Sequence, residues 1–86
     1  MNIDTIGEDL RQEMIRAVKL HPVFPQGQAA VSIIAEELGE LAKELNDMQD
    51  GVPGALDRAY HEAMHVTVTA YRELIELAEE KERRER

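Results

Sequence analysis

Two short stretches of the sequence carry residue types whose spacing could do chemistry. The stretch HEAMH, residues 61–65, matches the pattern H-E-x-x-H, in which two histidines one helical turn apart bind zinc and the glutamate activates water. The stretch EELGE, residues 36–40, places three carboxylates close together on a predicted helix. Like charges one turn apart repel, and a bound cation would remove that repulsion. The first pattern predicts a zinc protease, and the second predicts a cation site of another kind.

The surroundings of HEAMH do not suit a zinc protease. Such a site needs a third protein ligand and a strand that aligns the peptide substrate. No strand is predicted anywhere in the chain, and the acidic residues after the motif continue along the same helix and cannot fold back onto it: Glu73, Glu76, Glu79, Glu80 and Glu82. Only the preceding helix or another subunit could supply the ligand. We therefore interpret the stretch as E-x-x-H, formed by Glu62 and His65, with His61 outside the set.

Length, charge and cysteine content limit the classes of function. The 86 residues predict a single domain, residues 1–86. The absence of cysteine excludes disulfides and thiolate zinc sites. A net charge of −8 argues against a nucleic-acid polymer or an anionic membrane as the main partner, but it allows a nucleotide whose charge a divalent cation bridges. Without a long apolar run or a signal-peptide pattern, a cytoplasmic location is predicted.

Apolar residues at helical spacing predict an all-α fold of three helices. The helices are expected in residues 1–20, 26–48 and 53–80, separated by the proline- and glycine-containing stretches HPVFPQG and QDGVPG. The first helix is expected to begin near Asp4. It should end at His21, because the residue before a proline is driven out of the helical conformation.

Two local features refine this outline. Thr5 and Glu8 have the spacing of a capping box at the start of the first helix. Phe24, the only phenylalanine, lies in the first loop. It either closes the end of the helical core or forms a stacking wall for a flat ligand such as a nucleobase.

The pattern on the third helix predicts a partner subunit. The second helix has one apolar seam, which consists of Ile34, Leu38, Leu41, Leu45 and Met48. The third helix has two, one with Leu56, Tyr60, Ala63, Thr67, Ala70, Leu74 and Leu77, and one with Met64, Val68, Tyr71, Ile75 and Ala78. Two seams need neighbours on two sides, and one chain supplies few. We therefore expect a homodimer or a homotetramer.

Folding the second and third helices back on each other brings their polar residues to one level. If the chain reverses near Gly51, residue i lies opposite residue 102 − i. Glu40 then faces Glu62, and Glu37 faces His65. Carboxylates and an imidazole that converge from two helices are the usual ligands of a metal site inside a helical bundle. The alternative is a solvated seam of ion pairs.

At this point the chain resembles a known family. EELGEL on one helix, followed after 21 residues by EAMH on the next, is similar to the signature E-E-x-x-E … E-x-x-D of the MazG-like all-α nucleotide pyrophosphohydrolases. The resemblance covers about residues 26–78. It implies a helical bundle built by oligomerisation, with Mg²⁺ or Mn²⁺ as cofactor. The implied reaction is hydrolysis of a nucleoside triphosphate to the monophosphate and pyrophosphate.

The resemblance also implies roles for individual residues. Glu37, Glu40 and Glu62 would be metal ligands, joined by His65 at the position where the family has aspartate. An imidazole suits Mn²⁺ or another transition metal better than Mg²⁺, which prefers oxygen. Glu36 and Glu37 would be the catalytic carboxylates, with Glu36 as a further ligand or as the group that positions water. Separately from the resemblance, Lys43, Arg58 and Arg72 are candidate phosphate contacts, with ordinary surface cations as the alternative, and Phe24 is a candidate contact for the base.

Two other functions remain open from the sequence. One is an enzyme that resembles phosphoribosyl-ATP pyrophosphohydrolase, whose helices look similar. The other is a non-catalytic binding or assembly module with a degenerate metal site, because His65 departs from the family pattern. Metal-dependent release of pyrophosphate would separate an enzyme from such a module.

Overall fold

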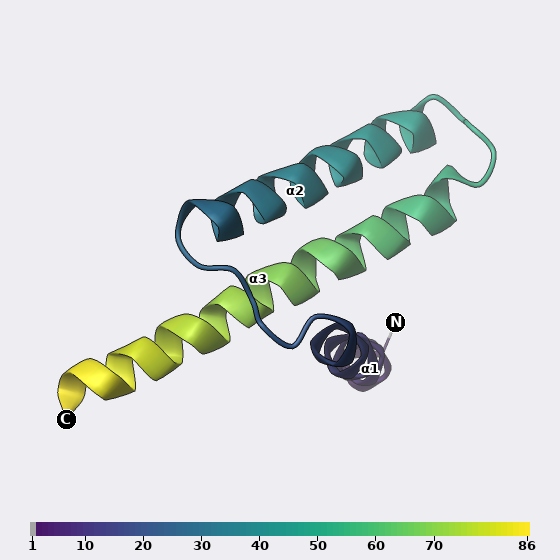
Figure 1. Cartoon of the computed structure of the whole chain (residues 1–86). Coiled ribbons are helices and arrows are strands. Elements are labelled where there is room, and N and C mark those ends of the chain that lie inside the picture. The colour runs from purple at the N-terminus through teal and green to yellow at the C-terminus, as the bar shows by residue number, and fades with distance from the viewer. Residues whose placement is uncertain (1) are drawn as a thin grey trace.

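Three helices make up the computed structural model, which describes residues 2–86 (Figure 1). They are α1 (Ile3–Leu20), α2 (Gln28–Gln49) and α3 (Ala55–Glu85). No strand occurs among residues 2–86. The predicted all-α, three-helix architecture is therefore confirmed.

The start of α1 differs from the prediction in the residue that caps it. The side-chain oxygen of Asn2 accepts hydrogen bonds from the backbone N–H groups of Asp4 and Thr5, at 2.8 and 3.4 Å. The capping box expected from Thr5 and Glu8 is therefore wrong, because Asn2 already occupies the N-cap position. The end of α1 is as predicted: the helix stops at Leu20, and the His21 N–H donates to the carbonyl of Ala17.

The ends of α2 and α3 lie within a few residues of those predicted. α2 begins two residues later than expected, after Gly27, whose positive φ of 64° breaks the backbone path. α3 continues five residues beyond the expected end. Its charged tail stays helical because Glu80 pairs with Arg83 and Arg84 one turn further on.

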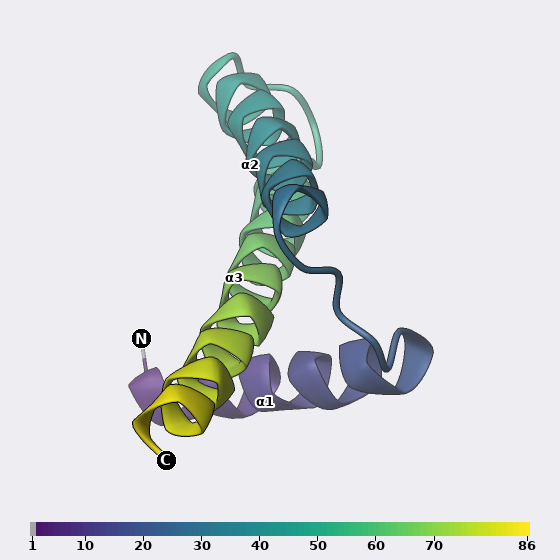
Figure 2. The same ribbon diagram turned by 60° about the vertical axis from the view of Figure 1, so that its left-hand side comes forward.

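α2 and α3 form an antiparallel hairpin, and α1 lies across it (Figures 1 and 2). The two helices of the hairpin run side by side in Figure 1, and Figure 2 shows α1 crossing α3 at a steep angle. Within residues 2–86, α1 packs on α3 and makes no comparable contact with α2. Because α3 has 31 residues and α2 has 22, the C-terminal part of α3 extends past the start of α2.

The single chain buries little of its apolar surface. The buried apolar residues are mostly small: Phe24, Ala30, Ala55, Ala59 and Val68. The first of the two seams predicted on α3 remains largely accessible, with Leu56 68% exposed and Leu74 61% exposed. Leu38, Leu45, Met48, Tyr60 and Leu77 are exposed as well. The predicted partner subunit stays a prediction, and these are the residues it would cover. No helix among residues 2–86 combines the length and the apolar character needed to cross a bilayer.

Candidate metal centre

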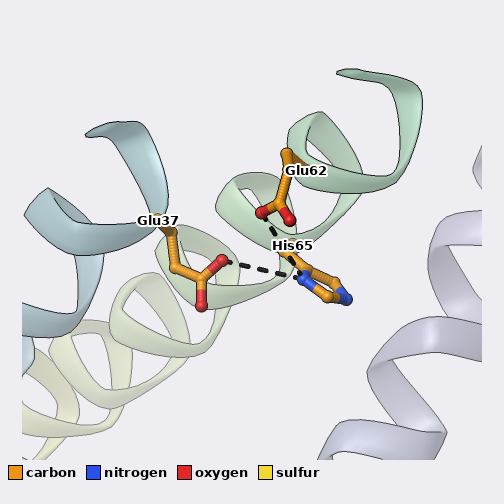
Figure 3. Close-up of side chains that lie close together, drawn as sticks. All are labelled: Glu37, Glu62 and His65. Carbon is orange, nitrogen blue, oxygen red and sulfur yellow. Dashed lines mark ion pairs between the residues drawn. The ribbon is translucent and has the colours of Figure 1, made fainter. Parts of the chain in front are cut away.

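Glu37, Glu62 and His65 converge between α2 and α3 (Figure 3). His65 Nδ1 lies 3.7 Å from a Glu37 oxygen and 3.8 Å from a Glu62 oxygen. One candidate ligand atom from each of the three residues lies within 4.8 Å of the other two. Two carboxylates and an imidazole could together hold one divalent cation.

The three residues meet because the hairpin has the register predicted from the sequence. Glu37 lies opposite His65, as the rule 102 − i requires. Glu44 pairs with Arg58 at 2.8 Å, which obeys the same rule two helical turns away. The predicted convergence of the second and third helices about Gly51 is thus confirmed.

Two oxygens of this cluster lack a hydrogen-bond donor. Oε2 of Glu37 and Oε2 of Glu62 are inaccessible to solvent and unpartnered among the described residues. These are the same two oxygens that face His65 Nδ1. Buried carboxylate oxygens are normally satisfied by donors or by cations. The donor set therefore fits a cation between the two glutamates.

Glu40 and Glu36 lie outside this group of three. Glu40 faces Glu62, as predicted, but it is exposed and is not among the residues that converge on one point. A hydrogen bond with Glu62, and the charge of Glu62, raise the pKa of the Glu40 carboxyl above its usual value. Glu36 is also exposed, and its charge contributes a smaller part of the same rise in pKa.

His61 stands beside the cluster but does not join it. Its ring centroid lies 4.2 Å from that of His65, and the two rings are inclined by 58°. His61 is exposed and is not one of the three converging residues. The geometry therefore groups Glu62 and His65 with Glu37 from α2. This grouping agrees with the interpretation of HEAMH as E-x-x-H.

A cavity of about 670 Å³ opens beside the cluster. Glu37 and His65 form part of its lining, together with residues of α1 and of the loop that follows α1. All three histidines of the chain line this cavity, as do two arginines. Glu13 and Glu37 line it too, so the hollow combines the three imidazoles with equal numbers of arginines and glutamates. Its size is that of a small-molecule site.

Phe24 is both buried and part of the cavity wall. Its residue exposure is 8%, and the Arg72 guanidinium lies 5.0 Å from its ring centroid. Arg72 also donates hydrogen bonds to the backbone carbonyls of His21 and Ala17, at 2.5 and 3.5 Å. Its guanidinium therefore ties the end of α1 to α3. The two roles considered for Phe24 are compatible in this position.

The other two candidate phosphate contacts are engaged elsewhere. Lys43 lies 3.6 Å from carboxylate oxygens of both Glu44 and Asp47, on its own helix, and it lines neither cavity. Arg58 pairs with Glu44 and borders a second hollow of about 470 Å³.

Sequence reasoning missed the contribution of α1 to the cavity. Glu13 and Arg16 of α1 line it, as does His21, which directly follows α1. The spacing of these residues in the sequence does not predict that they share a cavity, because no periodicity determines the angle at which α1 crosses α3.

Comparisons of the chain with protein-family models, with curated proteins and with solved structures gave no match.

Proposed function

We propose that this chain is a metal-dependent nucleotide pyrophosphohydrolase that converts a nucleoside triphosphate to the monophosphate and pyrophosphate. The observation that carries the proposal is a pair of unpartnered carboxylate oxygens, on Glu37 and Glu62, beside His65 at the edge of a cavity of about 670 Å³. The resemblance of EELGEL and EAMH to the MazG-like signature supplies the class of reaction.

Glu37, Glu62 and His65 would hold the cation, and Glu40 would join them from the exposed side. The bound cation supplies charge neutralisation and polarisation of the phosphate at which water attacks. The two glutamates arrive from different helices, so the hairpin fixes their separation. The imidazole of His65 favours Mn²⁺ over Mg²⁺.

The cavity suits the remainder of a nucleotide. Phe24, Ile33 and Val68 give it an apolar wall against which a base can lie. Arg16 and His61 border the same hollow and offer donors to phosphate oxygens. Glu37 is the better placed of the two predicted catalytic carboxylates to orient water, because it lines the cavity while Glu36 is not part of the lining.

A second copy of the chain belongs to the proposal. The exposed seam residues Leu38 and Leu45 on α2, and Leu56 and Leu74 on α3, recur at intervals that suit packing against further helices. A homodimer or homotetramer would bury them. The same exposed faces favour the second candidate function, a non-catalytic assembly module, which needs oligomerisation but no chemistry.

Release of pyrophosphate from a panel of nucleoside triphosphates tests the proposal. The panel is assayed with Mn²⁺, with Mg²⁺ and with a chelator, and phosphoribosyl-ATP is included as the alternative substrate. We expect release from at least one nucleotide with Mn²⁺ and none with the chelator. Glu62→Gln should abolish it, whereas Glu79→Gln, the same change at an exposed site on α3, should not. Binding of Mn²⁺ without release from any substrate would instead support the module.

A further inference from the structure

Glu44 is the only charged residue that is buried among residues 2–86, at 9% exposure. Its Oε2 accepts a hydrogen bond of 2.8 Å from Arg58 Nε. Arg58 Nη1 donates a second bond, of 3.2 Å, to the carbonyl of Pro53. One guanidinium therefore joins α2, the turn and α3. A buried carboxylate depends on such a partner, because an unpaired buried charge is strongly unfavourable.

The turn is shaped to admit this guanidinium. Gly54 has a φ of 78°, which favours glycine. A Cβ atom at this position would lie 2.9 Å from Arg58 Nη1, closer than such contacts normally allow. A larger residue here would therefore strain the backbone and oblige the Arg58 guanidinium to move.

Apart from the turn, the buried side chains do little to fix how far α3 is shifted along α2. The buried residues of the two helices include the small side chains of Ala30, Ala55 and Ala59, which interlock weakly. At the metal centre, Glu37 and Glu62 carry like charges on opposite helices. A specific polar pair is the best-attested device for setting register in such an interface.

The Glu44–Arg58 pair lies one heptad from Glu37–His65 on each helix. Residues seven apart share a helix face, so both pairs lie along the same interface. We propose that Arg58 is a positioning residue: by pairing with Glu44 it sets the register of α3 on α2 that brings His65 opposite Glu37. Arg58 acts through Glu44 and does not contact phosphate. This proposal rests on the proposed function in one respect only, namely that the residues which Arg58 positions form a metal centre.

Distances between spin labels test the register without any metal. The chain has no cysteine, so labels can be attached to cysteines introduced at the exposed positions Ser32 on α2 and Lys81 on α3. Labelled protein is diluted with unlabelled protein to suppress distances between subunits. In Arg58→Met we expect a shifted or broadened distance distribution, on the scale of one helical turn, about 5.4 Å. An unchanged distribution overturns the proposal.

The control is Lys43→Met, which removes the other cation near Glu44. Lys43 is on the same helix as Glu44, so its loss cannot change how α3 is aligned with α2. The distance distribution should stay that of the wild type. Reversing the pair, with Glu44→Arg combined with Arg58→Glu, should restore a single narrow distribution. If Arg58→Met does not fold, Arg58→Lys carries the same test, because an ammonium lacks the fork that reaches both Glu44 and Pro53.

Titration with Mn²⁺ tests the effect on the centre itself. In Arg58→Met the Kd should rise about 10-fold or more while the stoichiometry stays constant, as for loss of other groups that orient metal ligands. A merely structural loss would lower the stoichiometry, through a smaller folded fraction, and leave Kd unchanged. That outcome counts against the proposal. If the wild type binds no Mn²⁺, the metal centre is wrong, and the label distances alone decide the role of Arg58.

Discussion

Glu40 and Glu62 face each other across the α2–α3 interface, and a hydrogen bond between their carboxyl groups raises the pKa of Glu40. The negative charge of Glu62 raises it further, and that of Glu36 adds a smaller contribution, whereas His65 acts in the opposite direction. The pair therefore shares a proton more readily than two isolated glutamates would. A cation at this position would take over the role of that proton.

The stability of the metal-free protein should depend on pH through this pair. Because the folded pKa of Glu40 is raised above the usual 4.5, the folded state holds the proton more tightly than the unfolded chain does. The stabilisation that this proton contributes is fully present below the pKa of Glu40 in the unfolded chain and is lost as pH rises through its pKa in the folded protein. Thermal unfolding in a chelator, compared between the wild type and Glu40→Gln, checks this. As pH falls, the Tm of the wild type should rise relative to the Tm of Glu40→Gln. A difference that is constant with pH would contradict the assignment.

The effect of single substitutions on Mn²⁺ affinity should distinguish the metal ligands from neighbouring residues. Glu62→Gln should weaken Mn²⁺ binding by more than the roughly 10- to 100-fold that loss of an outer-shell partner costs. Glu40→Gln should also weaken it, because the Glu40 carboxylate faces Glu62 across the interface, and His61→Ala should do much less, because His61 is outside the group of three and supplies no carboxylate. Calorimetric titration measures all three. Loss of binding in His61→Ala as complete as in Glu40→Gln would instead identify a pair of histidine ligands in HEAMH.

His65→Asp should change the preferred metal. The substitution replaces the imidazole, whose Nδ1 faces Glu37 and Glu62, with the oxygen ligand of the MazG-like signature. An all-oxygen set suits Mg²⁺, so the ratio of Mg²⁺ to Mn²⁺ affinity should rise. Competition titrations on both proteins give this ratio. No rise would mean that His65 does not contact the cation.

The exposed seams predict association in solution. Light scattering at micromolar concentration should give a mass that is a multiple of the 9.8 kDa chain. Leu74→Glu should shift the equilibrium toward the monomer, because it places a charge in the apolar surface that a second copy would cover. Gln12→Glu introduces the same charge on α1 and serves as the control. A wild-type protein that stays monomeric throughout this range would refute the predicted oligomer.

Arg72→Ala should loosen α1. The substitution removes the hydrogen bonds to the carbonyls of His21 and Ala17 and the contact with the Phe24 ring. The free energy of unfolding should fall by about 2 kcal/mol, as measured by urea denaturation. Arg16→Ala is the control, since Arg16 pairs with Glu13 inside α1. Equal losses in the two variants would show that Arg72 has no special role in attaching α1.

The sequence predicts the hairpin well because its geometry is set locally. When a short turn joins two regular helices, the opposing residues can be predicted once the residue at which the chain reverses is known. Here that residue is Gly51. From there both helices rise by the same distance per residue, about 1.5 Å, so opposing pairs follow by counting. The positions of Glu37 against His65, and of Glu40 against Glu62, could be predicted in this way.

The features that the sequence did not predict depend on contacts between distant segments. Arg72 reaches across from α3 to the carbonyl of His21 and so ties the end of α1 to α3. No spacing rule links these residues. The position of Glu40 outside the converging group could not be predicted for a similar reason. Counting residues gives the position of Glu40 along the helix axis. Its burial depends on how the two helices are rotated about their axes.

The attachment of α1 to α3 alone has a consequence for the order of folding. The Glu44–Arg58 contact closes a loop of 14 residues, whereas the contacts of Arg72 with His21 and Ala17 span 51 and 55. Short loops close at a smaller entropic cost, so the hairpin is expected to form first, growing outward from Gly51. Docking of α1 then comes late. The cluster of Glu37, Glu62 and His65 would exist in that hairpin intermediate, and the cavity beside it would be completed only by the final step.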